Sequence, residues 1–252
     1  MLTRSLNMAL IVVLFCVASC GPKAKPIDMG NSHYKMAESY IAVEDYTNAL
    51  NEMLQAVNYK PNEPDYQSTL ALIYLEKKAY NLSEKHYKKA LQLKPNDPTV
   101  QNNLAALYLN MQRWDDAADL FRKVADNLLF RYQSRALIGL GVANFHGGYP
   151  LKAVMAFKEA INADSRNTSA LFLLSKTYYS MGKYSLTQRY LQQALALEPD
   201  NIDFHFLRGE TLLQLDEKEA AIFEFREVAN RADGTEKGMQ AREYLELLES
   251  QR

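Results

Sequence analysis

Four histidines, His33, His86, His146 and His205, are the side chains of this 252-residue sequence best suited to acid–base chemistry or metal binding. Each lies far from the next, so no two have the three- or four-residue spacing that places a pair of metal ligands on one helix face. The sequence also contains no phosphate-binding glycine loop, no dinucleotide-binding glycine turn and no nucleophile elbow. We therefore expect no catalytic residues, no metal site and no cofactor, and the protein is not expected to be an enzyme.

Cys20 lies at the end of a short apolar segment near the N-terminus. Arg4 precedes an apolar run over residues 8–17, which is shorter than the ~20 residues of a transmembrane helix and has the order of a secretory signal. The tetrapeptide Val-Ala-Ser-Cys that ends at Cys20 resembles the lipobox of bacterial lipoproteins, in which a signal peptide, here residues 1–19, is cut off before a cysteine that carries lipid. The alternative is an ordinary signal cleaved after Ser19, with Cys20 present by chance.

The lipobox resemblance implies a location. Lipoprotein maturation places a diacylglyceryl group and usually an N-acyl chain, such as palmitate, on the cysteine, and two or more chains hold a protein stably on a membrane. Gly21 follows Cys20 where inner-membrane lipoproteins commonly carry Asp, so the expected location is the outer membrane, facing the periplasm, through the lipid anchor only. Residues 20–29 contain two prolines and two lysines and are expected to form an extended tether.

The charge balance excludes one class of partner. The chain has 29 basic and 30 acidic residues, a net charge of −1, so it lacks the basic excess of a nucleic-acid-binding protein. The charges are scattered, as on the solvated faces of helices. With no convergent polar cluster for a small-molecule substrate, the expected partner is another protein.

Small residues recur at a regular spacing through the rest of the chain. The steps are 34 residues except for one step of 36, and the positions are Ala49, Ser83, Ala117, Ala153, Thr187 and Ala221. A period of 34 residues is that of the tetratricopeptide repeat, a pair of helices that stacks on its neighbours. The six units are residues 30–63, 64–97, 98–131, 134–167, 168–201 and 202–235.

Each unit carries the side chains that two packed helices require. Positions 4, 7, 8 and 11 of a unit share one helix face, and position 8 is always Ala, Gly or Ser, which lets the second helix approach closely. Position 24 is bulky in every unit: Met53, Tyr87, Phe121, Phe157, Leu191 and Phe225. His33 and His205 both fall at position 4, so packing between helices explains them. Arg208 replaces the large apolar residue at position 7 of the sixth unit, and we expect the neighbouring Leu207 to cover that site.

The C-terminal segment predicts one more helix. Asp233-Gly234-Thr235 interrupts the pattern, and residues 236–252 then carry an apolar stripe of Met239, Tyr244, Leu245 and Leu248. A repeat array needs such an element to cover its exposed end. The predicted fold is therefore all-α: a right-handed superhelical solenoid of six tetratricopeptide repeats with a C-terminal capping helix.

A partner-binding groove is expected on the concave side of this solenoid. In the tetratricopeptide fold, positions 2, 5, 9 and 12 of the first helix face that side. The groove residues predicted on this basis are Tyr34, Leu72, Leu75, Ile138, Val142, Phe145, Phe172, Tyr179 and Phe206. Large exposed apolar surfaces usually mark partner sites, and an amphipathic helix or an apolar strand is the expected guest. The alternative is that some of these side chains, above all those at position 12, pack against the neighbouring repeat.

The segment that contains the 36-residue step resembles a feature of one protein family. The stretch 125–136 includes Gln133-Ser134-Arg135 and leads into Gly139-Leu140-Gly141. It is similar to the linker before the fourth repeat of the type IV pilus pilotins (PilF, PilW and Tgl), where the corresponding tripeptide is Arg-Ser-Arg. A lipoprotein made of six repeats, a short tether and a cap also resembles that family. The resemblance implies that the groove binds a secretin subunit and that the lipid brings it to the outer membrane, where the secretin multimerises.

Two other kinds of lipoprotein are compatible with the same physical features. One is a repeat-containing subunit of the machinery that inserts β-barrel proteins. The other is a periplasmic adaptor for cell-wall enzymes. They differ from a pilotin in the partner and not in the binding physics.

Overall fold

The computed structural model describes residues 28–128 and 130–250, and within them all regular secondary structure is α-helical. The signal, Cys20 and tether residues 20–27 lie outside the described residues, as do positions 251–252 of the expected capping helix. The helices are α1 (Met29–Ala42), α2 (Tyr46–Tyr59), α3 (Pro64–Glu76), α4 (Tyr80–Leu93), α5 (Pro98–Asn110), α6 (Trp114–Ala125), α7 (Gln133–His146), α8 (Pro150–Ala163), α9 (Thr168–Ser180), α10 (Tyr184–Leu197), α11 (Ile202–Gln214), α12 (Lys218–Arg231) and α13 (Glu236–Glu249). The expected all-α class is confirmed for this part of the chain.

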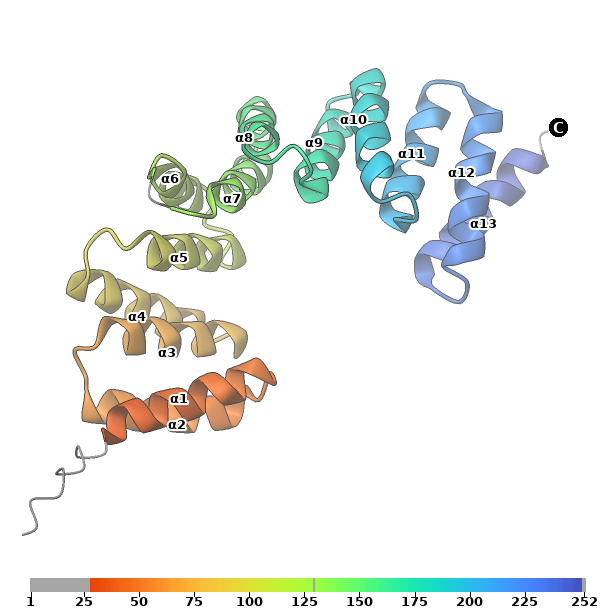
Figure 1. The fold of residues 1–252 in the computed structure, drawn as a ribbon. Helices are drawn as coiled ribbons and strands as arrows, with labels where there is room; N and C mark the ends of the chain where they lie inside the picture. Colours follow the sequence, from red (N-terminus) through yellow and green to blue (C-terminus); the bar gives the residue numbers. More distant parts are fainter. Residues whose placement is uncertain (1–27, 129, 251–252) are drawn as a thin grey trace, which may run out of the picture.

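The helices form a continuous array that bends into an arch (Figure 1). Each helix packs against the next, and from α3 to α11 each odd-numbered helix also contacts the next odd-numbered one. No comparable series of contacts links the even-numbered helices of the described residues. The odd-numbered helices therefore lie on the inner side of the curve, and Figure 1 shows α7 inside the bend with α6 and α8 outside it.

The first helix of every unit is followed, two residues beyond its end, by a residue with left-handed backbone. This residue occupies position 15 and is Glu44, Lys78, Gln112, Gly148, Gly182 and Asp216 in the six units, with φ between 58° and 84°. The conformation lets the amides just beyond the helix bond back to its last carbonyls, as Asp45 N does to Tyr40 O at 2.9 Å. Only glycine adopts it without steric cost, so four of the six turns hold a side chain against its backbone preference.

Close contact between the two helices of a unit depends on the small residue at position 8. In the fourth unit this is Gly141, where a Cβ atom would lie 2.3 Å from Cε1 of Phe157. In the sixth unit a Cβ on Gly209 would lie 2.8 Å from Cε1 of Phe225. Both phenylalanines are almost completely buried. In these two units the ring at position 24 thus occupies the space that a Cβ atom at position 8 would need.

Three of the four histidines join the two helices of a unit through hydrogen bonds. His33 Nδ1 lies 2.6 Å from Glu52 Oε2, and His205 Nδ1 lies 2.6 Å from Glu224 Oε2. His86 makes the reciprocal contact, with its Nδ1 2.7 Å from Oε1 of Gln67. Each pair joins position 4 to position 23, so these histidines hold helices together, as predicted for His33 and His205.

Arg208 belongs to the most buried of these polar pairs. Its Nη1 lies 3.2 Å from Oε1 of Glu224, whose other carboxylate oxygen contacts His205. His205 Nε2 also lies 2.8 Å from the carbonyl oxygen of Pro199. Leu207 is buried as expected, but the charge at position 7 is compensated by Glu224 and not simply covered by Leu207.

Replacement of Glu224 by alanine is expected to destabilise the C-terminal part of the array by about 3 kcal/mol, because His205 and Arg208 would lose their buried acceptor. Glu224→Gln, which keeps the size and one acceptor oxygen, should lose less. Urea denaturation of both variants would measure the difference. Equal stability of the alanine variant and the wild type would show that this network does not hold α11 and α12 together.

The two ends of the array differ. At the C-terminal end, α13 packs on α12 through Gly238 and Ala241, and Tyr244, Leu245 and Leu248 pack against the last buried cluster. The predicted stripe is wrong at Met239, which is 51% exposed. At the N-terminal end Met36 is 43% exposed, although its leucine equivalents in the second to fifth units are buried, because no unit of the described chain precedes the first.

Candidate functional site

All nine predicted groove residues lie on odd-numbered helices, and all are half-buried. Because the odd-numbered helices form the inner side of the arch, these side chains follow the concave face from α1 to α11. Their half-exposure shows that each is both in contact with the protein and accessible to solvent. The groove assignment remains a prediction that a binding experiment must test.

The N-terminal part of this face carries one aromatic stack and two leucines. Tyr34 stacks on Tyr66 with ring centroids 4.8 Å apart. Leu75 packs against a buried cluster of the second and third units, whereas Leu72 belongs to none of the clusters found among the described residues. Leu72 is thus the one predicted groove residue that packs on none of these clusters, although it is half-buried.

The central part of the face also serves packing. Ile138, Val142 and Phe145 of α7 all contact a buried cluster that includes Phe157 and Leu174. This contact supports the alternative that some predicted groove residues pack between repeats. Their remaining exposed surface still lies on the inner side, so the two roles are compatible at these positions.

The C-terminal part of the face is aromatic. Phe172 lies 4.9 Å from the ring of buried Phe204, and Tyr179 makes an edge contact with Tyr184 at 5.5 Å. Lys176, one helix turn beyond Phe172, places its Nζ 5.8 Å from that ring centroid. A cavity of about 340 Å³ adjoins Phe172 and extends toward the start of α11.

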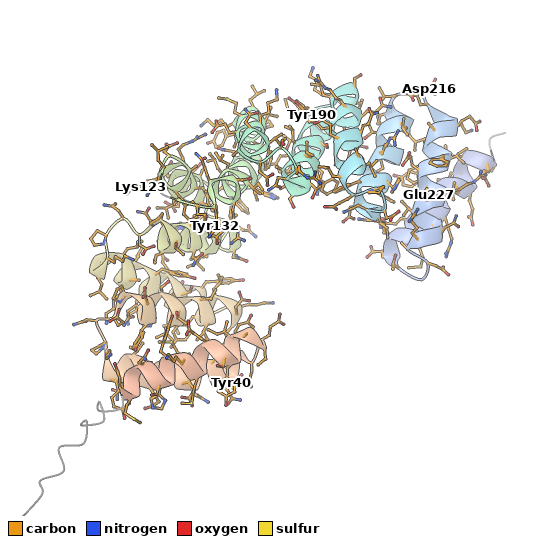
Figure 2. All side chains as sticks on the ribbon, viewed as in Figure 1. Tyr40, Lys123, Tyr132, Tyr190, Asp216 and Glu227 are labelled. Atoms are coloured by element: carbon orange, nitrogen blue, oxygen red, sulfur yellow. The ribbon has the colours of Figure 1, made fainter. Side chains whose placement is uncertain are left out.

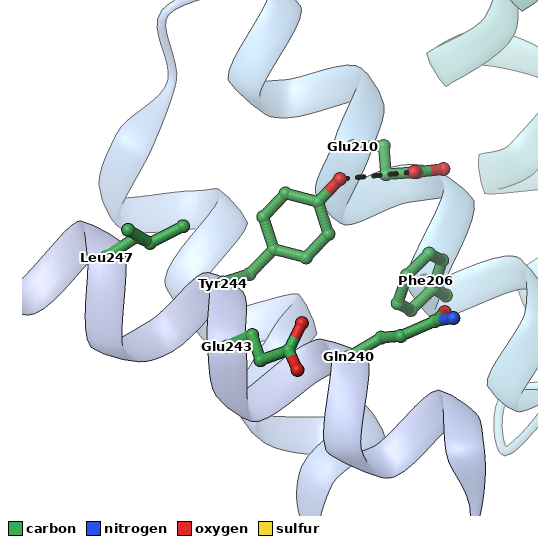
Figure 3. Close-up of a pocket in the computed structure, with 6 residues that line it drawn as sticks. All are labelled: Phe206, Glu210, Gln240, Glu243, Tyr244 and Leu247. Atoms are coloured by element: carbon green, nitrogen blue, oxygen red, sulfur yellow. Dashed lines mark hydrogen bonds between the residues drawn. The ribbon is translucent and has the colours of Figure 1, made fainter.

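A second cavity, of about 480 Å³, lies between α11 and the capping helix α13. Its lining residues are Phe206, Glu210, Gln240, Glu243, Tyr244 and Leu247 (Figure 3). Phe206 and Glu210 occupy positions 5 and 9 of the sixth unit, so this pocket, which we call the cap pocket, continues the concave face. Sequence reasoning gave α13 a capping role alone and assigned none of its four pocket residues to a site, although positions 240, 243, 244 and 247 share one helix face.

Glu210 is the central carboxylate of the cap pocket. The hydroxyl of Tyr244 donates a hydrogen bond to its Oε1 at 3.4 Å (Figure 3). Burial raises the pKa of the Glu210 carboxyl above its usual range, against the opposing effects of Tyr244 and Lys237. Burial, followed by the charge of Glu210, also raises the pKa of Tyr179 on α9. One predicted groove residue is thus electrostatically coupled to this pocket.

Replacement of Glu210 by glutamine is expected to stabilise the protein at neutral pH. A carboxyl whose pKa is raised in the folded state contributes stability below its ordinary pKa of 4.5 and loses it as the pH rises through the folded value. Because the group is half-exposed, the gain from Glu210→Gln should be only about 0.5 kcal/mol, or about 1–2 °C in melting temperature. Melting curves at pH 7 and pH 4 would test this, and a gain that does not shrink at pH 4 would contradict it.

The linker between α6 and α7 is held at the bend of the array. Phe130 is 8% exposed and makes an edge contact with Tyr132 at 6.0 Å. Gln133 Nε2 donates a hydrogen bond to the carbonyl oxygen of Ala125 at 2.8 Å. Tyr132 itself is 55% exposed (Figure 2). The guanidinium groups of Arg131 and Arg135 lie 5.8 and 5.5 Å from its ring centroid.

Residues 28–128 and 130–250 contain neither a candidate metal site nor a candidate membrane-spanning helix. No group of three or more His, Cys, Asp or Glu side chains in this part of the chain is arranged to hold a metal ion. None of its helices has the length and apolar character needed to span a membrane.

Comparisons with known sequence families identify the repeat. A family model described as "TPR repeat" matches residues 71–112, and one described as "Tetratricopeptide repeat" matches residues 99–126. The model "Anaphase-promoting complex, cyclosome, subunit 3" matches residues 152–228. None of these models describes an enzyme family. No curated protein sequence matches the chain.

Solved structures of similar fold cover most of the chain. The structure of PilF from Pseudomonas aeruginosa is 15% identical, covers 85% of this chain and 96% of its own, and has a TM-score of 0.72. That of PilW, described as a widely conserved type IV pilus biogenesis factor, is 18% identical, covers 84% and 98%, and has a TM-score of 0.77. YrrB, described as a TPR protein with an unusual peptide-binding site, is 15% identical, covers 76% and 97%, and has a TM-score of 0.60. The protein is an all-α solenoid of tetratricopeptide repeats, a fold that binds protein partners.

Proposed function

We propose that this protein is an outer-membrane pilotin: a lipoprotein whose concave face binds a secretin subunit of the type IV pilus and promotes its multimerisation. The observation that carries the proposal is the match in fold to PilF and PilW over nearly their whole length. The lipobox resemblance at Cys20 and the linker resemblance at Gln133-Ser134-Arg135 support it from the sequence.

The proposed mechanism separates location from recognition. Cys20 would carry the lipid that holds the protein at the membrane, and the half-buried apolar side chains of the odd-numbered helices would receive the partner. Anchoring both molecules at one surface raises the effective concentration of the secretin subunits there. The protein needs no catalytic group for this role, because assembly follows from binding and placement.

The proposal is tested by heat-resistant secretin multimers in cells. We expect the multimers to disappear when the gene is deleted, to return with the wild-type protein, and to return poorly with Cys20→Ala. An immunoblot of whole-cell extracts, with fractionation to locate the protein, measures all three. Multimers that persist after deletion would reject the pilotin role and direct the search to barrel-assembly or cell-wall partners.

A further inference from the structure

The cap pocket holds negative charge without a matching cation. Glu210 and Glu243 both line it, and no Lys, Arg or His side chain does. In the described chain neither carboxylate forms an ion pair, whereas Glu227 on α12 and Glu249 on α13 are each bound by an arginine. Two acidic side chains from different helices thus face one cavity, and both remain available to a cation from outside.

The nearest cation, Lys237, is already engaged at the rim. It forms an ion pair with Asp203, and its Nζ lies 5.6 Å from the ring centroid of Phe206. Its attraction opposes the rise in the pKa of Glu210 without cancelling it. The pocket therefore keeps the electrostatic character of an unfilled cation site.

The remaining walls suit a cation on an aliphatic stem. The rings of Phe206 and Tyr244 meet edge to face, 6.0 Å apart at 70°, and aromatic faces attract cations. Leu247 is 61% exposed and extends the apolar surface beside Tyr244 (Figure 3). Long cationic side chains lay their methylene groups on such apolar surface while the charged end reaches polar groups.

We propose that the cap pocket receives the guanidinium group of an arginine on the polypeptide bound along the concave face. A guanidinium is planar and carries five N–H donors, so it can bond to two carboxylates on different helices and lie against an aromatic ring at the same time. An ammonium group on lysine cannot make this combination of contacts. The identity of the donor as a bound polypeptide rests on the proposed function.

The location of the cap pocket gives α13 a second role. Phe206 and Glu210 continue the row of concave-face positions, and Tyr179 links that row to Glu210 from the preceding repeat. A guest polypeptide that lies along the apolar face therefore reaches the cap pocket where that face ends, beside α11. The apolar row provides contact area, and the pocket selects guests that carry an arginine at the matching position.

The direct test uses N-acetyl-L-arginine amide and its neutral analogue N-acetyl-L-citrulline amide as probes. Each is titrated into the full chain in detergent micelles while the methyl resonances of Leu247 are followed, with the exposed Leu151 on α8 as the control position. We expect a saturable shift at Leu247 with the arginine probe and about tenfold weaker binding of citrulline. Glu210→Gln/Glu243→Gln, which keeps the shape of the pocket, should weaken arginine binding to the level of citrulline.

Equal binding of the two probes, or arginine binding that survives in the double variant, would overturn the proposal whatever happens in cells. A second experiment, in cells, distinguishes the arginine proposal from the pilotin proposal. Loss of secretin multimers in cells that carry the double variant supports the role in recognition, whereas full multimers overturn that role and leave the pilotin proposal intact. Multimers that do not depend on the gene at all would reject the pilotin proposal, and the probes would still decide the chemistry of the pocket.

Discussion

Leu72→Glu is expected to abolish capture of the secretin partner while the protein stays folded. Leu72 is half-exposed on α3, on the concave side, and packs against none of the buried clusters found in the described residues. A carboxylate there would have to lose its water when an apolar guest binds, which costs far more than the lost leucine contact. We expect affinity to fall at least about 100-fold, measured by co-precipitation of the secretin and by its heat-resistant multimers.

The matched control is Leu151→Glu. Leu151 is 68% exposed on α8, an even-numbered helix on the outer side of the arch, so the same chemical change there should leave capture unchanged. Circular dichroism and melting curves should be similar for both variants and the wild type. Phe172→Glu is less clean, because Phe172 packs on buried Phe204 and part of any loss would come from the repeat interface. Normal capture by Leu72→Glu would show that the concave face around α3 is not the site.

Gly141→Ala is expected to destabilise the fourth unit strongly although it adds a single methyl group. The new Cβ would lie 2.3 Å from Cε1 of Phe157, and the helix backbone leaves it no other direction. Phe157 is 1% exposed, so its ring cannot move aside without opening the core of the fourth unit. Overpacking of this kind costs about 2–3 kcal/mol, which urea denaturation would detect.

Adding Phe157→Leu to Gly141→Ala should restore the fit between positions 8 and 24 of the fourth unit. The fifth unit combines Ser175 at position 8 with Leu191 at position 24, and both are fully buried. Gly141→Ala/Phe157→Leu should therefore regain most of the lost stability, although Phe157→Leu alone leaves a cavity. If the double variant is as unstable as the sum of the two single variants, the contact between positions 8 and 24 does not control helix approach.

The cap pocket changes how the concave face is understood. An apolar surface alone favours any guest with a matching apolar stripe, and therefore gives little selectivity. Two carboxylates without a cation disfavour guests that cannot supply one, because charge left in a covered site is costly. In the free protein, the ionised Glu210 carboxylate is already partly buried, which costs free energy. For this reason we expect the Glu210→Gln variant to be more stable than the wild type at neutral pH.

The repeat pattern was enough to predict the fold class, because its information is local. Small residues at positions 8 and 20 and bulky ones at position 24 determine which faces of two consecutive helices meet, and that contact is repeated along the array. The same logic placed His33 and His205 between helices. It did not reveal the left-handed turns at Glu44, Lys78 and Gln112, because these residue types carry no turn signal. Asp216 is a residue type that tolerates this conformation, but a single Asp does not specify it.

The sequence by itself thus determined the all-α solenoid and the row of side chains on the odd-numbered helices. Only the tertiary structure decided which of them also serve as packing, since Val142 and Leu72 have the same helical position but different neighbours. It also decided that Arg208 is paired with Glu224 and that Met239 stays exposed. The cap pocket exists only because α13 folds back beside α11. The residue pattern of one helix shows which of its own faces is apolar, but it does not predict which face of another helix will pack against it.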